Sequence, residues 1–67
     1  MNARTRAIYA RRAELARAVV LPANIARAYV DGERLAVAFV EGGRKSTTLE
    51  RWSLATVEDA VRRLSTP

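Results

Sequence analysis

The stretch that decides the fold runs from Ile25 to Trp52 and reads IARAYVDGERLAVAFVEGGRKSTTLERW. Its segments rich in Val, Tyr, Phe and Thr are typical of β-strands, and they are interrupted at Asp31-Gly32 and at Gly42-Gly43. Such dipeptides supply the positive φ angles that tight hairpin turns need. The stretch therefore predicts a three-stranded antiparallel meander, with strands at residues 25–30, 34–40 and 44–52.

The second hairpin has two alternative registers. A two-residue loop at 42–43 sets Arg34 opposite Arg51, which brings two like charges together. A three-residue loop at 41–43, whose last glycine takes the left-handed conformation, sets Arg34 opposite Glu50 instead. A complementary cross-strand pair contributes a few tenths of a kcal/mol up to about 1 kcal/mol, whereas like charges directly opposite are destabilising. We therefore predict the three-residue loop.

The two faces of the sheet follow from the alternation of side chains along each strand. In the predicted register Leu35 lies opposite Leu49, and it shares the core face of the central strand with Val37 and Phe39. The alanines at positions 36 and 38 then lie on the outer face. The third strand holds successive Ser and Thr residues at 46–48, which favours a solvated edge strand over a site that pairs with another chain.

One helix is expected before the meander in the sequence and another after it. Residues 3–21 are dominated by Ala, Arg, Leu and Glu and precede Pro22, which predicts a helix over 3–21. A second helix is predicted over 54–64, with either Ser53 or Thr56 as its N-cap. Each helix carries an apolar stripe at helical spacing. The stripes are formed by Ile8, Leu15 and Val19 in the first helix and by Leu54, Val57, Val61 and Leu64 in the second.

The predicted fold class is α+β, in the order helix, three-stranded antiparallel meander, helix. With 67 residues the chain is expected to form one small two-layer domain over 1–67, because fewer than about 70–80 residues support only one small core. The apolar residues include many alanines, so the core is thin. A homodimer or a larger partner would bury more apolar surface.

The positive charge is concentrated in the first helix. The chain has 12 Lys and Arg against 7 Asp and Glu, a net charge of +5. Residues 1–20 hold five arginines against Glu14, which gives 5 − 1 = +4. Guanidinium groups suit bidentate contacts with phosphate or carboxylate, although a genome rich in G and C would also favour Arg over Lys. In the second helix, by contrast, Glu58 with Arg62 and Asp59 with Arg63 form two expected i,i+4 pairs of structural character.

Several functions are excluded by composition. The chain has no Cys and no His, which removes thiolate chemistry, disulfides, the usual zinc ligands and the commonest general base near neutral pH. Gly42-Gly43 leads into a strand and not into a helix, so no phosphate-binding loop is formed. We expect no enzyme, cofactor, metal or small-molecule substrate. Without a signal segment, disulfides or a membrane span, a cytoplasmic location is expected.

The expected function is that of a small basic binding protein, a nucleic-acid-associated accessory or regulatory factor. The second hairpin adds two cations to those of the first helix as a further clamp on a phosphate backbone. The alternative is a protein–protein assembly or inhibitor module of a phage or mobile element. The predicted nucleic-acid or partner-binding residues are Arg4, Arg6, Arg11, Arg12, Arg17, Arg44 and Lys45.

Two families share features with this chain. The element order resembles the double-stranded-RNA-binding domain, but Glu58 and Asp59 stand where that family carries lysines, so its function is not transferred. The run Arg51-Trp52-Ser53-Leu54-Ala55-Thr56-Val57, an aromatic strand end leading into an amphipathic helix, is similar to the phage head-to-tail joining protein W family. That resemblance covers the last half of the chain and implies a small assembly protein that completes the portal connection.

Overall fold

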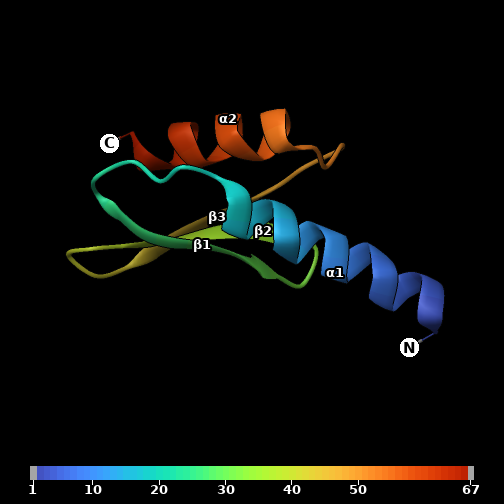
Figure 1. Ribbon diagram of the computed structural model, residues 1–67. Helices are drawn as coiled ribbons and strands as arrows, with labels where there is room; N and C mark the ends of the chain where they lie inside the picture. Colours follow the sequence, from blue (N-terminus) through green and yellow to red (C-terminus); the bar gives the residue numbers. More distant parts are fainter. Residues whose placement is uncertain (1, 67) are drawn as a thin grey trace.

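The predicted α+β fold is confirmed by the computed structural model, which describes residues 2–66. One sheet with the strand order β1-β2-β3 is antiparallel throughout. α2 covers one face of this sheet and lies across β2, while α1 runs along the β1 edge and also contacts α2 (Figure 1). The elements are α1 (Ala3–Ala18), β1 (Ile25–Asp31), β2 (Arg34–Phe39), β3 (Arg44–Thr48) and α2 (Leu54–Ser65).

The first helix ends earlier than the predicted residue 21. Ala18 is its last residue, and Val19 is already extended, with φ −75° and ψ 135°. Two β-branched residues in succession and the restriction that Pro22 places on the residue before it both disfavour helical backbone here. The extended Val19 side chain is buried in the core. Within residues 2–66, neither helix has the length and apolar character that crossing a membrane requires.

The second helix begins with a capping box, which resolves the choice between two N-caps. The Ser53 Oγ accepts from the Thr56 backbone N–H at 3.2 Å, and the Thr56 Oγ1 accepts from the Ser53 N–H at 2.9 Å. The predicted ion pair between Asp59 and Arg63 is present at 3.0 Å. The second predicted ion pair, between Glu58 and Arg62, is not formed within residues 2–66. An exposed pair of this kind contributes only about 0.3–0.5 kcal/mol, too little to fix two long side chains.

The third strand is shorter than predicted, and its register differs by two residues. Leu35 lies opposite Thr47, not Leu49, and the final pair joins Arg34 to Thr48. The strand ends there because Arg34 is the first residue of β2, so later residues have no partner in the ladder. A shift of two residues preserves the side-chain alternation, and the predicted core and outer faces of β2 are therefore retained.

The loop of the second hairpin lies one position earlier than predicted. Gly42 N–H donates to the Phe39 carbonyl at 3.0 Å, and Phe39 N–H donates to the Gly43 carbonyl at 3.0 Å. These bonds enclose the three residues 40–42 in the loop, in the pattern of a turn followed by a glycine bulge. Both glycines have positive φ, 106° at Gly42 and 83° at Gly43. The prediction that only Gly43 needs this conformation is wrong.

Replacement of either loop glycine by Ala is expected to lower the free energy of unfolding by about 1–2 kcal/mol, because an L-residue is strained at positive φ. The control is Gly32→Asn in the first hairpin, where φ is 62° and Asn is better tolerated. Chemical denaturation of the three variants measures the costs. A cost at Gly43 but none at Gly42 would contradict the observed loop.

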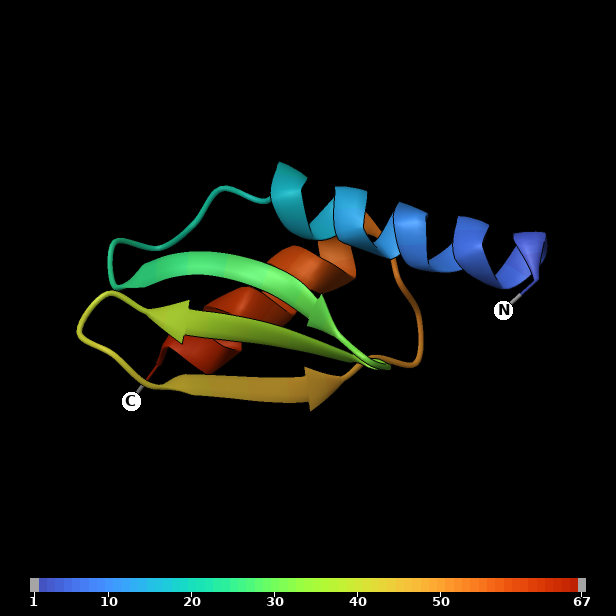
Figure 2. The ribbon, with the colours of Figure 1, turned by 90° about the horizontal axis from the view of Figure 1, so that it is seen from below.

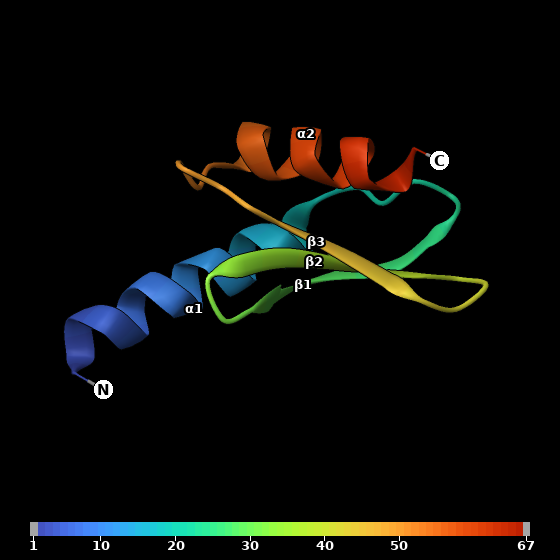
Figure 3. The ribbon, with the colours of Figure 1, turned by 180° about the vertical axis from the view of Figure 1, so that it is seen from behind.

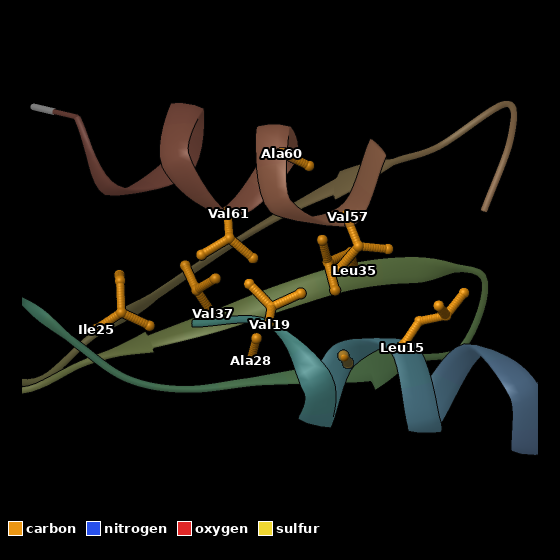
Figure 4. Packing of buried hydrophobic residues seen from close by; sticks show 10 residues of the cluster. Leu15, Val19, Ile25, Ala28, Leu35, Val37, Val57, Ala60 and Val61 are labelled. Carbon is orange, nitrogen blue, oxygen red and sulfur yellow. The ribbon is translucent and has the colours of Figure 1, made fainter. Parts of the chain in front are cut away.

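The core lies between the sheet and the two helices. Leu35 and Val37 of β2 are fully buried, and Figure 4 shows Val57 and Val61 of α2 pointing toward them. The rest of the buried cluster comes from the end of α1, from β1 and from α2. Its other members are Leu15, Ala16, Val19, Ile25, Ala28 and Ala60.

Two residues of the predicted apolar stripes lie outside this core. Ile8 and Leu54 are each 43% exposed. Ile8 lies on the N-terminal half of α1, which projects beyond the sheet, and Leu54 is the first residue of α2 (Figure 3). Phe39, also predicted as core, is only partly buried against the cluster. The core is therefore smaller than the stripes suggest.

Candidate nucleic-acid interface

The N-terminal half of α1 extends away from the rest of the fold. Figures 1 and 3 show its first turns projecting past the end of the sheet. The buried residues of the helix, Leu15 and Ala16, both lie in its last two turns. The earlier turns are thus held by few contacts and present most of their surface to solvent.

A groove runs between this part of α1 and the segment that leads into α2. Its volume is about 440 Å³, and its lining combines cations with an aromatic ring and aliphatic groups. The Arg12 guanidinium lies over the Trp52 ring, 5.0 Å from its centroid, and 5.6 Å from the centroid of Tyr9. The lining residues are Arg4, Ala7, Ile8, Arg11, Arg12, Glu50 and Trp52.

Arg12 is the groove cation that contacts aromatic rings. Each cation–π contact at an exposed site is worth about 0.5–1 kcal/mol, and two rings hold the same guanidinium. Helical spacing places Arg12 beside Ile8 and Leu15, so its aliphatic stem can cover part of the apolar stripe. Trp52, the aromatic residue just before the N-cap Ser53, forms a wall of the groove.

The positive charge around the groove is only partly compensated, because Glu50 is the one carboxylate among its lining residues. The first turn of α1 contains Arg4 and no acidic residue, although a cation there is unfavourable beside the positive end of the helix dipole. Arg11 lies 3.8 Å from Glu14, but both side chains are largely exposed, so the pair is weak. Among residues 2–66, no carboxylate pairs with the arginines at positions 4, 6, 12 and 17.

The seven predicted binding residues occupy three places. Arg4, Arg11 and Arg12 line the groove together. Helical spacing places Arg6 and Arg17 on the other flank of α1. The two remaining cations, at positions 44 and 45, start β3 next to the second hairpin, at the opposite end of the sheet from the projecting part of α1 (Figure 1). A ligand that touched both ends would have to follow the long axis of the molecule, which measures 37 Å.

A second arginine-bearing surface lies on the sheet face that no helix covers (Figure 2). Arg27 lies over the Tyr29 ring, 4.4 Å from its centroid. Across the sheet, Arg34 Nε donates to Ser46 Oγ at 2.9 Å. Arg27, Tyr29 and Arg34 are not among the residues predicted from the sequence, because local charge density is highest in the first helix. The signal was available in the period of two, which puts residues 27, 29 and 31 on one face.

Arg44 belongs to this open face as well. A hydrogen bond with the Tyr29 side chain, followed by the charges of Tyr29 and Asp31, raises the pKa of Arg44. Its ordinary pKa is already so high that the guanidinium is charged at any physiological pH. These neighbours therefore do not switch its charge.

These surfaces offer guanidinium groups and aromatic rings. Such groups recognise phosphate and carboxylate oxygens and stack on flat ligands. Within residues 2–66, no three carboxylates are grouped so that they could hold a metal ion. No protein-family model, curated protein or solved structure matches this chain. Function must therefore be inferred from the chemistry of the two surfaces.

Proposed function

We propose that this protein binds nucleic acid and acts without catalysis, as an accessory or regulatory factor. The observation that carries the proposal is the grouping of Arg4, Arg11 and Arg12 around an exposed groove beside Trp52. Guanidinium groups bind phosphate through two parallel hydrogen bonds. Three of them on one groove suit a backbone that presents phosphates in succession.

The arrangement also favours fast and tight association with a polyanion. The net charge of +5 and the positive end of the α1 dipole attract phosphates over a distance of about one Debye length. Because Arg12 is already held by two aromatic rings, less side-chain entropy is lost when it binds. Contacts of this kind release counterions from the nucleic acid, so the affinity must fall as salt is added.

Arg4→Ala is the sharpest single test of this proposal. Arg4 lies unfavourably at the start of α1, so its removal should leave stability unchanged or slightly higher. If Arg4 touches a phosphate, the same change should weaken binding and reduce the slope of log affinity against log salt by about 1. Fluorescence anisotropy with a labelled random-sequence duplex measures the slope.

The matched control is Arg63→Ala, which removes an equal charge from α2. Arg63 is paired with Asp59 at 3.0 Å and lies outside the groove. It should therefore leave the salt slope unchanged. Equal losses from Arg4→Ala and Arg63→Ala would mean that only the overall charge matters, and absence of binding by the wild type would reject the proposal.

The alternative proposal is a protein–protein assembly module, such as the phage head-to-tail joining role that the last half of the sequence suggests. The observation that favours it is the exposure of Ile8, 43% of which is accessible, in the same groove as Trp52. A protein partner would cover this apolar surface. Its complex should resist salt and be weakened by Ile8→Ser, whereas binding to nucleic acid should be weakened more by Arg4→Ala.

A further inference from the structure

We propose that the open face of the sheet binds single-stranded nucleic acid and receives an unpaired base on the stacked side chains of Arg27 and Tyr29. This inference rests on the proposed function and names the class of nucleic acid. The face is free of both helices (Figure 2).

The strand register arranges the open face in three rows. Arg27, Ala38 and Arg44 form the first row, from β1 through β2 to β3. The second row consists of Tyr29, Ala36 and Ser46, and the third of Asp31, Arg34 and Thr48. Neighbouring strands are about 4.8 Å apart and successive rows about 7 Å apart. Each of the three strands therefore contributes one arginine to the open face, and the three rows together cover an area about the size of a nucleotide.

Small residues along β2 form the floor of this face. Ala36 is only 1% exposed, yet it does not belong to the buried cluster under the helices. Its cover must come from the open face itself, where Tyr29 and Ser46 are its cross-strand neighbours. A hollow of about 250 Å³ lies beside it, lined by Asp31, Ala36, Arg44, Lys45 and Ser46. The middle of the face is thus covered by its cross-strand neighbours, and the hollow beside it is bordered by polar and charged groups.

Tyr29 provides the stacking surface. Arg27 lies 4.4 Å from its ring centroid, so a guanidinium is already placed against the ring. Unpaired bases stack on aromatic rings and on guanidinium groups. A base can extend this stack by lying on Arg27 or can replace Arg27 on the ring. In either case the displaced or covered guanidinium remains close to the adjacent phosphate.

The charge of the face is complementary to a nucleic-acid backbone. It holds three arginines and the carboxylate of Asp31, a balance of 3 − 1 = +2. Arg34 of β2 donates two hydrogen bonds to Ser46 of the neighbouring strand β3. Its Nε donates to the Ser46 Oγ at 2.9 Å, and its Nη2 donates to the Ser46 carbonyl at 3.4 Å. Arg44 lines the hollow beside Ala36. Arg27, which lies against the Tyr29 ring, and Arg34 are therefore held in place before a ligand arrives, which lowers the entropic cost of binding.

A single strand fits this face better than a duplex. The base edges and ring faces of a duplex are stacked inside it, where Tyr29 on a sheet cannot reach them. A single strand can turn its bases toward the ring while its phosphates follow the arginines. The open face and the α1 groove would then bind different forms of nucleic acid.

The test compares a labelled random single strand with a duplex of the same composition. Tyr29→Ala is expected to weaken single-strand binding by about fivefold to a hundredfold, the range for loss of one stacked base, and to leave duplex binding within about twofold. Tyr29→Phe keeps the ring and should bind as the wild type does. Tyr29→Leu keeps the apolar cover of Ala36 without a ring, so it should show the same loss even if Tyr29→Ala folds poorly.

The outcomes separate the two proposals. If the wild type binds neither probe, the proposed function fails and this inference fails with it. If the wild type binds both and Tyr29→Leu binds the single strand as well as wild type does, only this inference is overturned. A second copy of the chain on the open face would instead give a dimer that Tyr29→Leu dissociates. Sedimentation equilibrium detects such a dimer, and finding it would also overturn the inference.

Discussion

Leu35→Ala is expected to lower the free energy of unfolding by about 2–5 kcal/mol, the range for large-to-small changes in a packed core. Leu35 is 0% exposed and lies between the sheet and α2. A single core in so small a domain rarely supplies more than about 3–5 kcal/mol in total. The variant should therefore be largely unfolded at room temperature, as measured by circular dichroism.

Leu54→Ala is the matched control, because it removes the same atoms from a residue that is 43% exposed. It loses only part of the burial energy and should cost about 1 kcal/mol. Urea denaturation followed by the fluorescence of Trp52 gives both values. A Leu54→Ala cost equal to that of Leu35→Ala would show that the centre of the core is placed wrongly.

The double change Arg4→Ala with Arg11→Ala should have the largest effect on function. Each phosphate contact contributes about 0.9 to the slope of log affinity against log salt. Loss of two contacts should weaken duplex binding by about 50- to 100-fold at 0.1 M salt and reduce the slope by about 2. Both side chains line the groove beside Trp52.

Two arginines on the other flank of α1 provide the matched control, because their removal changes the net charge by the same amount. Arg6→Ala with Arg17→Ala removes two cations from the same helix without touching the groove lining. If the groove is the binding surface, this double variant should keep most of the affinity and slope. Equal effects of the two double variants would assign binding to the charge of the whole helix and would contradict a localised interface.

The hairpins and caps were predictable because single residues determine them. Asp31-Gly32 and Gly42-Gly43 mark turns, and the structure has a turn at each. The alternation of Leu35 and Val37 identified the buried face of β2, which is fully buried at both residues. Ser53 was one of two N-cap candidates, and its exchange of hydrogen bonds with Thr56 selected it.

The register of the second hairpin could not be fixed by charge pairing. The predicted register rested on pairing Arg34 with Glu50, which is worth at most about 1 kcal/mol. The observed register instead satisfies the positive φ of two adjacent glycines, Gly42 and Gly43, and ends β3 where β2 ends. Similarly, helix propensity favoured α1 through residue 21, but burial of an extended Val19 prevailed. In the hairpin a local backbone requirement outweighed weak charge pairing, and at the end of α1 a core contact outweighed helix propensity.

The candidate site was predictable only in part. The arginines of α1 were evident from charge density, and three of them line one groove. The contribution of Trp52 depends on the path of the segment between β3 and α2, which no local pattern determines. Arg27 and Tyr29 share a face through the alternation along β1, whereas Arg34 joins them only through the register of the sheet. Long-range pairing, which sequence patterns do not specify, creates the open face.

The most direct test of nucleic-acid binding is the salt dependence of the wild-type affinity for a random-sequence duplex. If the three groove arginines each neutralise one phosphate, log affinity should fall linearly with log salt, with a slope of about −2.7. The measurement is fluorescence anisotropy between about 20 and 300 mM salt, the range over which counterion release dominates. No detectable binding at the lowest salt, or an affinity that does not change with salt, would contradict the account.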